Sequence, residues 1–110
     1  MSYDPFVRDR LPSPDQLPEF RLLDYPERLN AAAELLKGGA PDALAVVNVL
    51  GRWTYADLDS FSGRIARLLV DAQGLVPGNR VLLRGPNGYT LFAAWLGVLK
   101  AGGVVVATMP

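Results

Sequence analysis

The clearest pattern along the chain is a run of apolar residues at helical spacing near its centre. Its members recur at threes and fours: Tyr55, Leu58, Phe61, Ile65, Leu68 and Ala72. This spacing predicts an amphipathic helix that begins after Thr54 and ends at Gly74. Asp57 stands three residues after Thr54, as in a capping box, and Trp53 is placed to pack on Leu58 as a hydrophobic staple.

Two shorter elements are predicted ahead of this helix. The Ala- and Leu-rich stretch from Leu29 to Lys37 predicts a short helix, for which Asn30 is a candidate cap. Residues 43–49 predict a strand, and Gly51 allows a tight return of the chain into residues 52–54. We therefore expect a helix followed by a hairpin.

The last third of the chain is its most apolar part. The run Arg80–Leu83 has no polar alternation beyond its first residue, and Val104–Ala107 is a second apolar run. Such runs predict strands that are buried on both faces, as in a parallel sheet. Between them, Asn87 is placed to cap a helix over residues 89–101 that is apolar almost all round. The alternation of helices and strands predicts an α/β fold with parallel β-α-β units.

The first segment has a different character. Residues 1–30 hold five of the nine prolines and ten of the 22 charged residues, but no glycine. Proline at this density excludes a long helix or a central strand, and the apolar residues among them are too many for a disordered tail. We expect residues 1–28 to form an extended, Pro-rich arm along the surface of a larger body, with a floppy terminus as the alternative.

Composition narrows the possible chemistry. The 110 residues include no His and no Cys, which excludes a disulfide framework, a zinc or haem site, a Cys nucleophile and an imidazole base. A formal net charge of zero lacks the basic field on which nucleic-acid binding relies. The N-terminus is unlike a secretory signal, and Lys100 interrupts the longest apolar run, Leu91–Met109. We expect a soluble, cytoplasmic protein without nucleic-acid or membrane partners.

The loop of residues 84–88 has the position of a phosphate-binding loop, between a buried strand and a helix N-terminus. Its composition argues against that role. Pro86 lacks an amide donor, and neither G-x-G-x-x-G nor a following Lys-Ser or Lys-Thr is present. A connector is the favoured interpretation, and an anion site is the alternative.

The other candidate groups also favour structural roles. The serines, at positions 2, 13, 60 and 62, lack both a histidine partner and a nucleophile elbow. Asp57 and Asp59 stand two apart on a helix and point in different directions, so they are not a carboxylate pair. Lys37 and Lys100 lie at helix ends, where the helix dipole accounts for them, and the aromatic residues fall at core spacing: Trp53, Phe61, Phe92 and Trp95. We therefore predict no catalytic, cofactor-binding or metal-binding residue in this chain.

Three segments nevertheless combine into a recognisable set of motifs. Residues 53–58 read Trp-Thr-Tyr-Ala-Asp-Leu, residues 74–81 read Gly-Leu-Val-Pro-Gly-Asn-Arg-Val, and residues 99–104 read Leu-Lys-Ala-Gly-Gly-Val. In order and spacing they resemble the first core motif, the turn and strand that follow it, and the second core motif of the AMP-forming adenylate enzymes. Asp57 stands where the family usually has Glu, and Asn79 where it usually has Asp.

Two segments of the arm narrow this resemblance. Residues 6–12 and 25–30 look like the N-termini of benzoate- and 2-aminobenzoate-type CoA ligases. The resemblance implies a two-step reaction of aromatic acid degradation. A carboxylate attacks the α-phosphate of Mg-ATP to give an acyl-adenylate and pyrophosphate, and the CoA thiol then displaces AMP.

The resemblance also implies that the nucleotide site lies outside this chain. In the family, a Ser/Thr/Gly-rich loop ending in Pro-Lys, the adenine motif, the ribose-binding Asp and the catalytic Lys all follow the second core motif. ATP, Mg and CoA are therefore implied for the full-length parent protein, and none is expected to bind to the fragment alone.

The leading hypothesis is that the chain is an inactive N-terminal fragment of an aromatic-acid–CoA ligase. Residues 29–110 would be an incomplete N-terminal part of the AMP-binding domain, and the partners would be the rest of the parent chain and an aromatic carboxylate. A content of 50% hydrophobic residues is high for a complete domain of this length and ordinary for a slice of a larger enzyme. Transfer to a carrier protein instead of CoA stays open. The alternative from another class is a truncated, non-catalytic α/β binding or interaction module.

Overall fold

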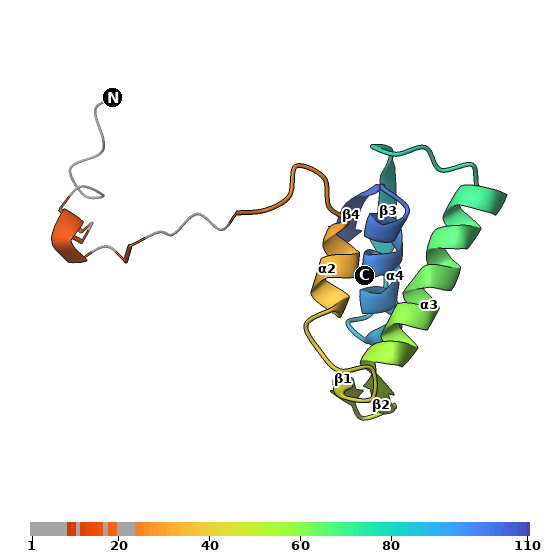
Figure 1. Cartoon of the computed structure of the whole chain (residues 1–110). Helices are drawn as coiled ribbons and strands as arrows, with labels where there is room; N and C mark the ends of the chain where they lie inside the picture. Colours follow the sequence, from red (N-terminus) through yellow and green to blue (C-terminus); the bar gives the residue numbers. More distant parts are fainter. Residues whose placement is uncertain (1–8, 11, 17, 20–23) are drawn as a thin grey trace.

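The computed structural model describes residues 9–10, 12–16, 18–19 and 24–110. Figure 1 shows the helices and strands from residue 31 onward gathered into one body. In chain order the elements are η1 (Pro14–Gln16), α2 (Ala31–Leu36), β1 (Leu44–Asn48), β2 (Gly51–Thr54), α3 (Tyr55–Arg67), η2 (Leu68–Ala72), β3 (Arg80–Arg84), α4 (Tyr89–Lys100) and β4 (Val104–Thr108). Each helix and strand predicted from residue 29 onward is therefore present, within a few residues of its predicted bounds.

Half of the N-terminal arm lies outside the described residues. Of residues 1–28, the structure describes 9–10, 12–16 with the 3₁₀ turn η1, 18–19 and 24–28, in which Tyr25 is exposed. The segment 6–12, which carries part of the resemblance to benzoate-type ligases, lies largely outside the described residues. A surface-bound arm ahead of a domain that starts at residue 29 stays a prediction.

Two separate pairs of strands make up the β-structure. β3 and β4 pair in parallel, from Arg80 opposite Val104 to Arg84 opposite Thr108, with α4 as the crossover between them. β1 and β2 form an antiparallel hairpin with an irregularity between Leu44 and Val46. The α/β class, the parallel β-α-β unit and the hairpin at Gly51 are thus confirmed.

Helix α4 occupies the centre of the body. It lies between α2 and α3 in Figure 1 and packs on β3 and β4 behind it. The apolar side chains that are at most 2% exposed are Ala32, Leu58, Ala93, Leu96 and Val98. Three of these five belong to α4, as expected for a helix that is apolar almost all round, because it has neighbours on several sides.

The contact between α3 and α4 is close at Gly97. A Cβ atom placed on Gly97 would lie 2.8 Å from Cγ2 of Ile65 and 3.0 Å from the backbone oxygen of Ser62. Real Cβ atoms do not approach other atoms so closely, so this crossing requires a residue without a side chain. Ser62 is fully buried at the crossing, and its hydroxyl donates to the carbonyl of Asp59 over 3.1 Å.

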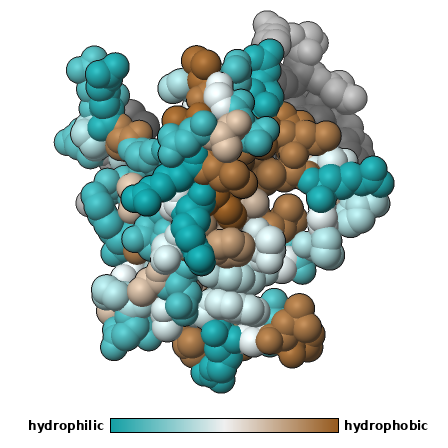
Figure 2. Space-filling view, turned by 90° about the vertical axis from the view of Figure 1, so that its right-hand side faces the viewer, coloured by the Kyte–Doolittle hydropathy of each residue, from teal (hydrophilic) through white to brown (hydrophobic). Residues whose placement is uncertain are grey.

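The strands of the parallel pair are covered on one face only, contrary to the burial on both faces that their sequence predicts. Val81, Leu83 and Val105 on the face toward α4 are half-buried, whereas Leu82, Val104 and Val106 on the opposite face are 66%, 47% and 42% exposed. Phe92, predicted in the core, is 43% exposed. Figure 2 shows contiguous apolar patches that reach the surface beside hydrophilic residues. The physical reason is that α4 supplies one layer and the described residues supply no second layer.

We predict that Gly97→Ala destabilises the chain by about 1–3 kcal/mol, because the added methyl group pushes α3 and α4 apart. Gly63→Ala, in α3, is the matched control: its Cβ would have only Nζ of Lys100 nearby, at 3.9 Å. The control is expected to be neutral or up to about 1 kcal/mol more stable, because alanine favours the helix. Urea unfolding followed by circular dichroism measures both, and equal effects of the two substitutions would contradict the close crossing.

Candidate functional site

The loop between β3 and α4 is the position where an α/β fold commonly binds ligands. It borders a groove of about 660 Å³ whose other wall is the tip of the β1–β2 hairpin. The lining includes Val49, Leu50, Trp53, Leu82, Pro86 and Leu91. Gly88 is the N-cap of α4 and no side chain caps this helix, so the predicted capping by Asn87 is wrong. Asn87 stands one residue before the cap position.

The chemistry of this loop does not suit a triphosphate. Pro86 has no amide hydrogen, and the groove beside the loop is lined largely by apolar side chains. A phosphate-binding loop needs a cluster of backbone donors, usually with a lysine and a hydroxyl for the metal ion. The residues of this loop therefore do not have the composition of a phosphate-binding loop, and its role as a connector stays a prediction.

Thr54 and Asp57 form the capping box predicted for α3. The backbone amide of Asp57 donates to Oγ1 of Thr54 over 3.1 Å, and the backbone amide of Thr54 donates to Oδ2 of Asp57 over 2.9 Å. The Thr54 hydroxyl also donates to that carboxylate oxygen. The bond from the Thr54 amide and then that from its hydroxyl hold the pKa of the Asp57 carboxyl below its usual 3.8. Asp57 is therefore a helix cap.

An aromatic stack joins the hairpin to both long helices. The rings of Trp53 and Tyr89 are stacked at 4.3 Å between centroids, and the Phe61 ring is stacked with Tyr89 at 5.5 Å. The guanidinium of Arg64 stands 5.4 Å from the Phe61 ring centroid. Burial raises the pKa of the Tyr89 hydroxyl, and the charge of Asp57 raises it further. The sequence placed Trp53 and Phe61 in the core but gave no signal for Tyr89 as their common partner.

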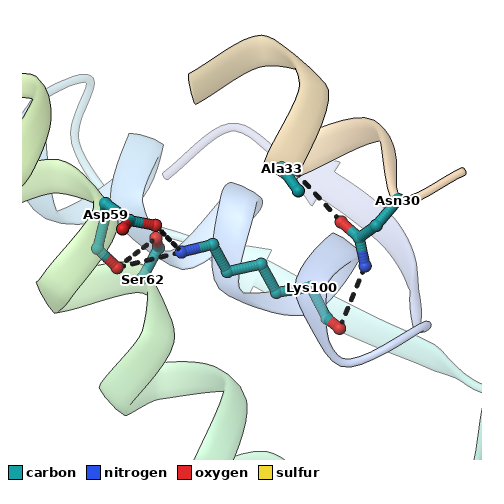
Figure 3. Close-up of polar contacts among 5 residues, drawn as sticks. All are labelled: Asn30, Ala33, Asp59, Ser62 and Lys100. Carbon is teal, nitrogen blue, oxygen red and sulfur yellow. Dashed lines mark hydrogen bonds and ion pairs between the residues drawn. The ribbon is translucent and has the colours of Figure 1, made fainter. Parts of the chain in front are cut away.

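Lys100, at the end of α4, is tied to α3. Its ammonium group donates to the backbone carbonyl of Asp59 over 2.9 Å and forms an ion pair of 2.5 Å with Oδ1 of the same residue, as Figure 3 shows. The Lys100 side chain is only 17% exposed. The sequence assigned Lys100 to the helix dipole and did not predict its contact with Asp59. No local sequence pattern indicates that contact, because the two residues are 41 positions apart.

Asn30 makes a second tie at the same end of α4. Its Oδ1 accepts from the backbone amide of Ala33 over 3.2 Å, which confirms the predicted cap of α2. Its Nδ2 donates to the carbonyl of Lys100 over 3.2 Å (Figure 3). One amide side chain thus satisfies a donor at the start of α2 and an acceptor at the end of α4.

The remaining candidates are not brought together. Ser60 is exposed, Ser62 is buried at the crossing of α3 and α4, and Ser2 lies outside the described residues. Lys37 pairs with Glu34 in its own helix over 2.6 Å. Asp57 and Asp59 have different partners, so they are confirmed as independent carboxylates. In the described ranges, no group of three acidic, His or Cys side chains is arranged to hold a metal ion.

A membrane-spanning role has no support in the described residues either, since none of their helices is both long and apolar enough to cross a bilayer.

Comparison with known proteins identifies the family. Residues 36–110 match the AMP-binding enzyme family, and the chain belongs to it. A plipastatin synthase polypeptide of Bacillus subtilis (strain 168) is 36% identical over 83 residues, which make up 74% of this chain and 3% of that protein. The salicyl-AMP ligase / salicyl-S-ArCP synthetase of Mycobacterium tuberculosis (strain ATCC 25618 / H37Rv) is 39% identical over 75 residues, 64% of this chain and 13% of that protein.

The fold agrees with this assignment. The crystal structure of apo MatB from Rhodopseudomonas palustris superposes with a TM-score of 0.67 at 32% identity, over 73% of this chain and 16% of that one. The structure is therefore the α/β fold of the N-terminal region of adenylate-forming enzymes. The chain spans less than a fifth of the length of each of these three proteins.

We predict that Asp57→Asn destabilises the chain at neutral pH and has little effect in strong acid. Because the pKa of Asp57 is lower in the folded chain than its ordinary value of 3.8, the carboxylate stabilises the fold above that value. This contribution is lost as the pH falls through the folded pKa. Urea unfolding at neutral pH and at about pH 3 measures the change. Asp71→Asn, on exposed η2, is the control, and an Asp57 effect independent of pH would contradict the capping role.

We predict that Lys100→Met destabilises the chain by about 1–3 kcal/mol, because the carbonyl and carboxylate of Asp59 lose the charged donor that the largely buried Lys100 side chain supplies. Lys37→Met is the control: it breaks an exposed ion pair, so its effect is about 0.5 kcal/mol or less. Asp59→Asn should be milder than Lys100→Met, since the backbone carbonyl of residue 59 still accepts from Lys100. Equal effects of the Lys37 and Lys100 substitutions in urea unfolding would refute a stabilising contact between Lys100 and Asp59.

Proposed function

We propose that this chain is the N-terminal scaffold of an ATP-dependent, AMP-forming ligase that activates an aromatic carboxylic acid and transfers it to CoA. The observation that supports this most directly is the family match over residues 36–110. The segments that carry the family's core motifs stand at ends of the two helices that cross. The first begins α3 with its capping box, and the second runs from the end of α4 into β4.

The contribution of the chain to this reaction is structural. In the first step a carboxylate oxygen attacks the α-phosphorus of ATP and pyrophosphate leaves; in the second the CoA sulfur attacks the acyl carbon, loses its proton and displaces AMP. The described residues offer neither a nucleotide cradle nor an acidic cluster for Mg. ATP, Mg and CoA would be held by later parts of a longer polypeptide, which is the proposed partner of this chain. Such an enzyme would work in the cytoplasm, where ATP and CoA are supplied.

The exposed apolar surface supports a larger parent protein. Leu82, Val106 and Phe92 are each more than two-fifths exposed, although the strands and helix that carry them read as buried elements. Soluble proteins seldom expose apolar patches of this kind without a partner. The small share of each relative that the chain covers supports the same inference.

The aromatic substrate rests on the arm resemblance and on one relative. The Mycobacterium tuberculosis protein is named for salicyl-AMP, which is an aromatic acyl-adenylate, and it is 39% identical to this chain. The same name gives ArCP as the acceptor, so transfer to a carrier protein is the second candidate for the last step. Benzoate, 2-aminobenzoate and salicylate are the acids to test first.

We predict that the 110-residue chain alone catalyses no ATP–pyrophosphate exchange, whereas the polypeptide encoded by the continuing reading frame does so with an aromatic acid. Exchange reports adenylate formation whatever the acceptor is. A subsequent assay with CoA, and separately with a carrier protein, identifies the acceptor. Exchange by residues 1–110 would overturn the scaffold role. A stop codon directly after Pro110 would overturn the ligase and leave the non-catalytic binding module.

A further inference from the structure

The face of the parallel pair opposite α4 has a mixed apolar and basic surface. Because side chains alternate along a strand, one face carries Arg80, Leu82 and Arg84 from β3 and Val104, Val106 and Thr108 from β4. All six residues are exposed. We call them the outer face; α4 packs on the other side of the strands.

The outer face is arranged as an apolar strip with a positive charge at either end. The register sets Arg80 opposite Val104, Leu82 opposite Val106 and Arg84 opposite Thr108. Leu82 and Val106 therefore lie in the middle, and Val104 lies beside them at the Arg80 end. Neither arginine forms an ion pair within the described part of the chain. Four residues of strand separate their Cα atoms by about 13 Å.

This arrangement disfavours a second copy of the chain as the cover. Two outer faces placed against each other would set four guanidinium groups around one small apolar contact, and like charges across an interface oppose association. It also disfavours a second sheet of ordinary apolar composition, which would leave both arginines without carboxylate partners. The charges instead call for carboxylates at the two ends of an apolar element.

We propose that the outer face is covered by an amphipathic helix of the same polypeptide, with an apolar stripe flanked by two acidic residues that pair with Arg80 and Arg84. The helix would complete the layer order helix, sheet, helix that parallel strands require. This inference rests on the proposed function, since the helix belongs to the longer parent protein.

The spacing of the arginines defines this helix further. A helix running along the strands places residues seven or eight positions apart on one face, separated by about 11–12 Å at about 1.5 Å per residue. That distance is close to the separation of Arg80 and Arg84. The partner helix should therefore carry Asp or Glu at two positions seven or eight apart, with Leu, Ile, Val or Ala between them on the same face. Guanidinium–carboxylate pairs at both ends would fix its register on the strip.

The 110-residue chain contains no cysteine, so a variant with one introduced cysteine is labelled at that site alone; in the longer polypeptide any other cysteine is first replaced by serine. Leu82→Cys places a thiol at the middle of the outer face, and Arg67→Cys places one on the exposed surface of α3 as the matched control. Each is made in the 110-residue chain and in the polypeptide of the continuing reading frame. Reaction with a maleimide is expected to be at least about tenfold slower at position 82 in the longer protein only, and unchanged at position 67.

Charge substitutions test the acidic partners in the longer protein. Combining Arg80→Glu and Arg84→Glu with Leu82→Cys should restore labelling towards the rate of the short chain, whereas Arg80→Lys and Arg84→Lys should keep most of the protection. Arg52→Glu, at the exposed position of β2, is the control and should leave the rate unchanged.

The outcomes separate this inference from the proposed function. Adenylate formation by the longer protein, with fast labelling at position 82, overturns the cover and leaves the ligase in place. Protection that survives the glutamate substitutions overturns the acidic helix. Protection of the 110-residue chain that vanishes on dilution identifies a second copy as the cover and overturns the proposal too.

Discussion

The crossing of α3 and α4 at Gly97 is the contact on which the other packing depends. A side chain at Gly97 would meet Ile65 and the backbone of Ser62, so both helices are held at a distance set by backbone and small groups. Helix α4 then serves as the common neighbour of α2, α3 and the parallel strands. A shift of α4 away from α3 would move the hydrophobic cluster around Leu58 and Leu96 and the strands together, because packed interiors transmit small displacements.

Hydrogen bonds at the C-terminal end of α4 fix the position of α4 relative to α3 and α2. Lys100 spans to Asp59 on α3, and Asn30 spans from the start of α2 to the carbonyl of Lys100. Helix ends leave carbonyls without partners, and here a residue some 70 positions earlier supplies one donor. The chain then turns at Gly102, whose φ of +77° favours glycine, and enters β4. The residues of the second core motif therefore have structural roles in this chain: Lys100 binds α3 and Gly102 makes the turn into β4.

Local sequence patterns predicted the helices and strands well, but they did not predict contacts between residues far apart in the chain. Thr54 and Asp57 are three residues apart, so their capping box could be read from the sequence. The pairing of Lys100 with Asp59 and the stacking of Tyr89 on Trp53 depend on how distant segments meet, which no local pattern contains. Asn87 was misassigned as a cap because Gly88 takes that position in the fold. The strands around Leu82 and Val106 were predicted as buried on both faces because apolar runs report the environment a sequence suits, and these residues supply only one covering layer.

The exposure of strand residues whose sequence suits burial indicates the kind of protein to which this sequence is adapted. α4 covers Val81 and Leu83 on one side of the sheet, while on the opposite side apolar residues lie between Arg80 and Arg84. On the α4 side as well, Phe92 and Trp95 line an apolar hollow of about 260 Å³ together with Leu83. A small domain that had to stand alone would gain solubility from polar residues at these positions, at no loss of internal packing. Their apolar character is explained if further layers bury both sides, so the scaffold and the catalytic parts of the ligase would be joined through these surfaces.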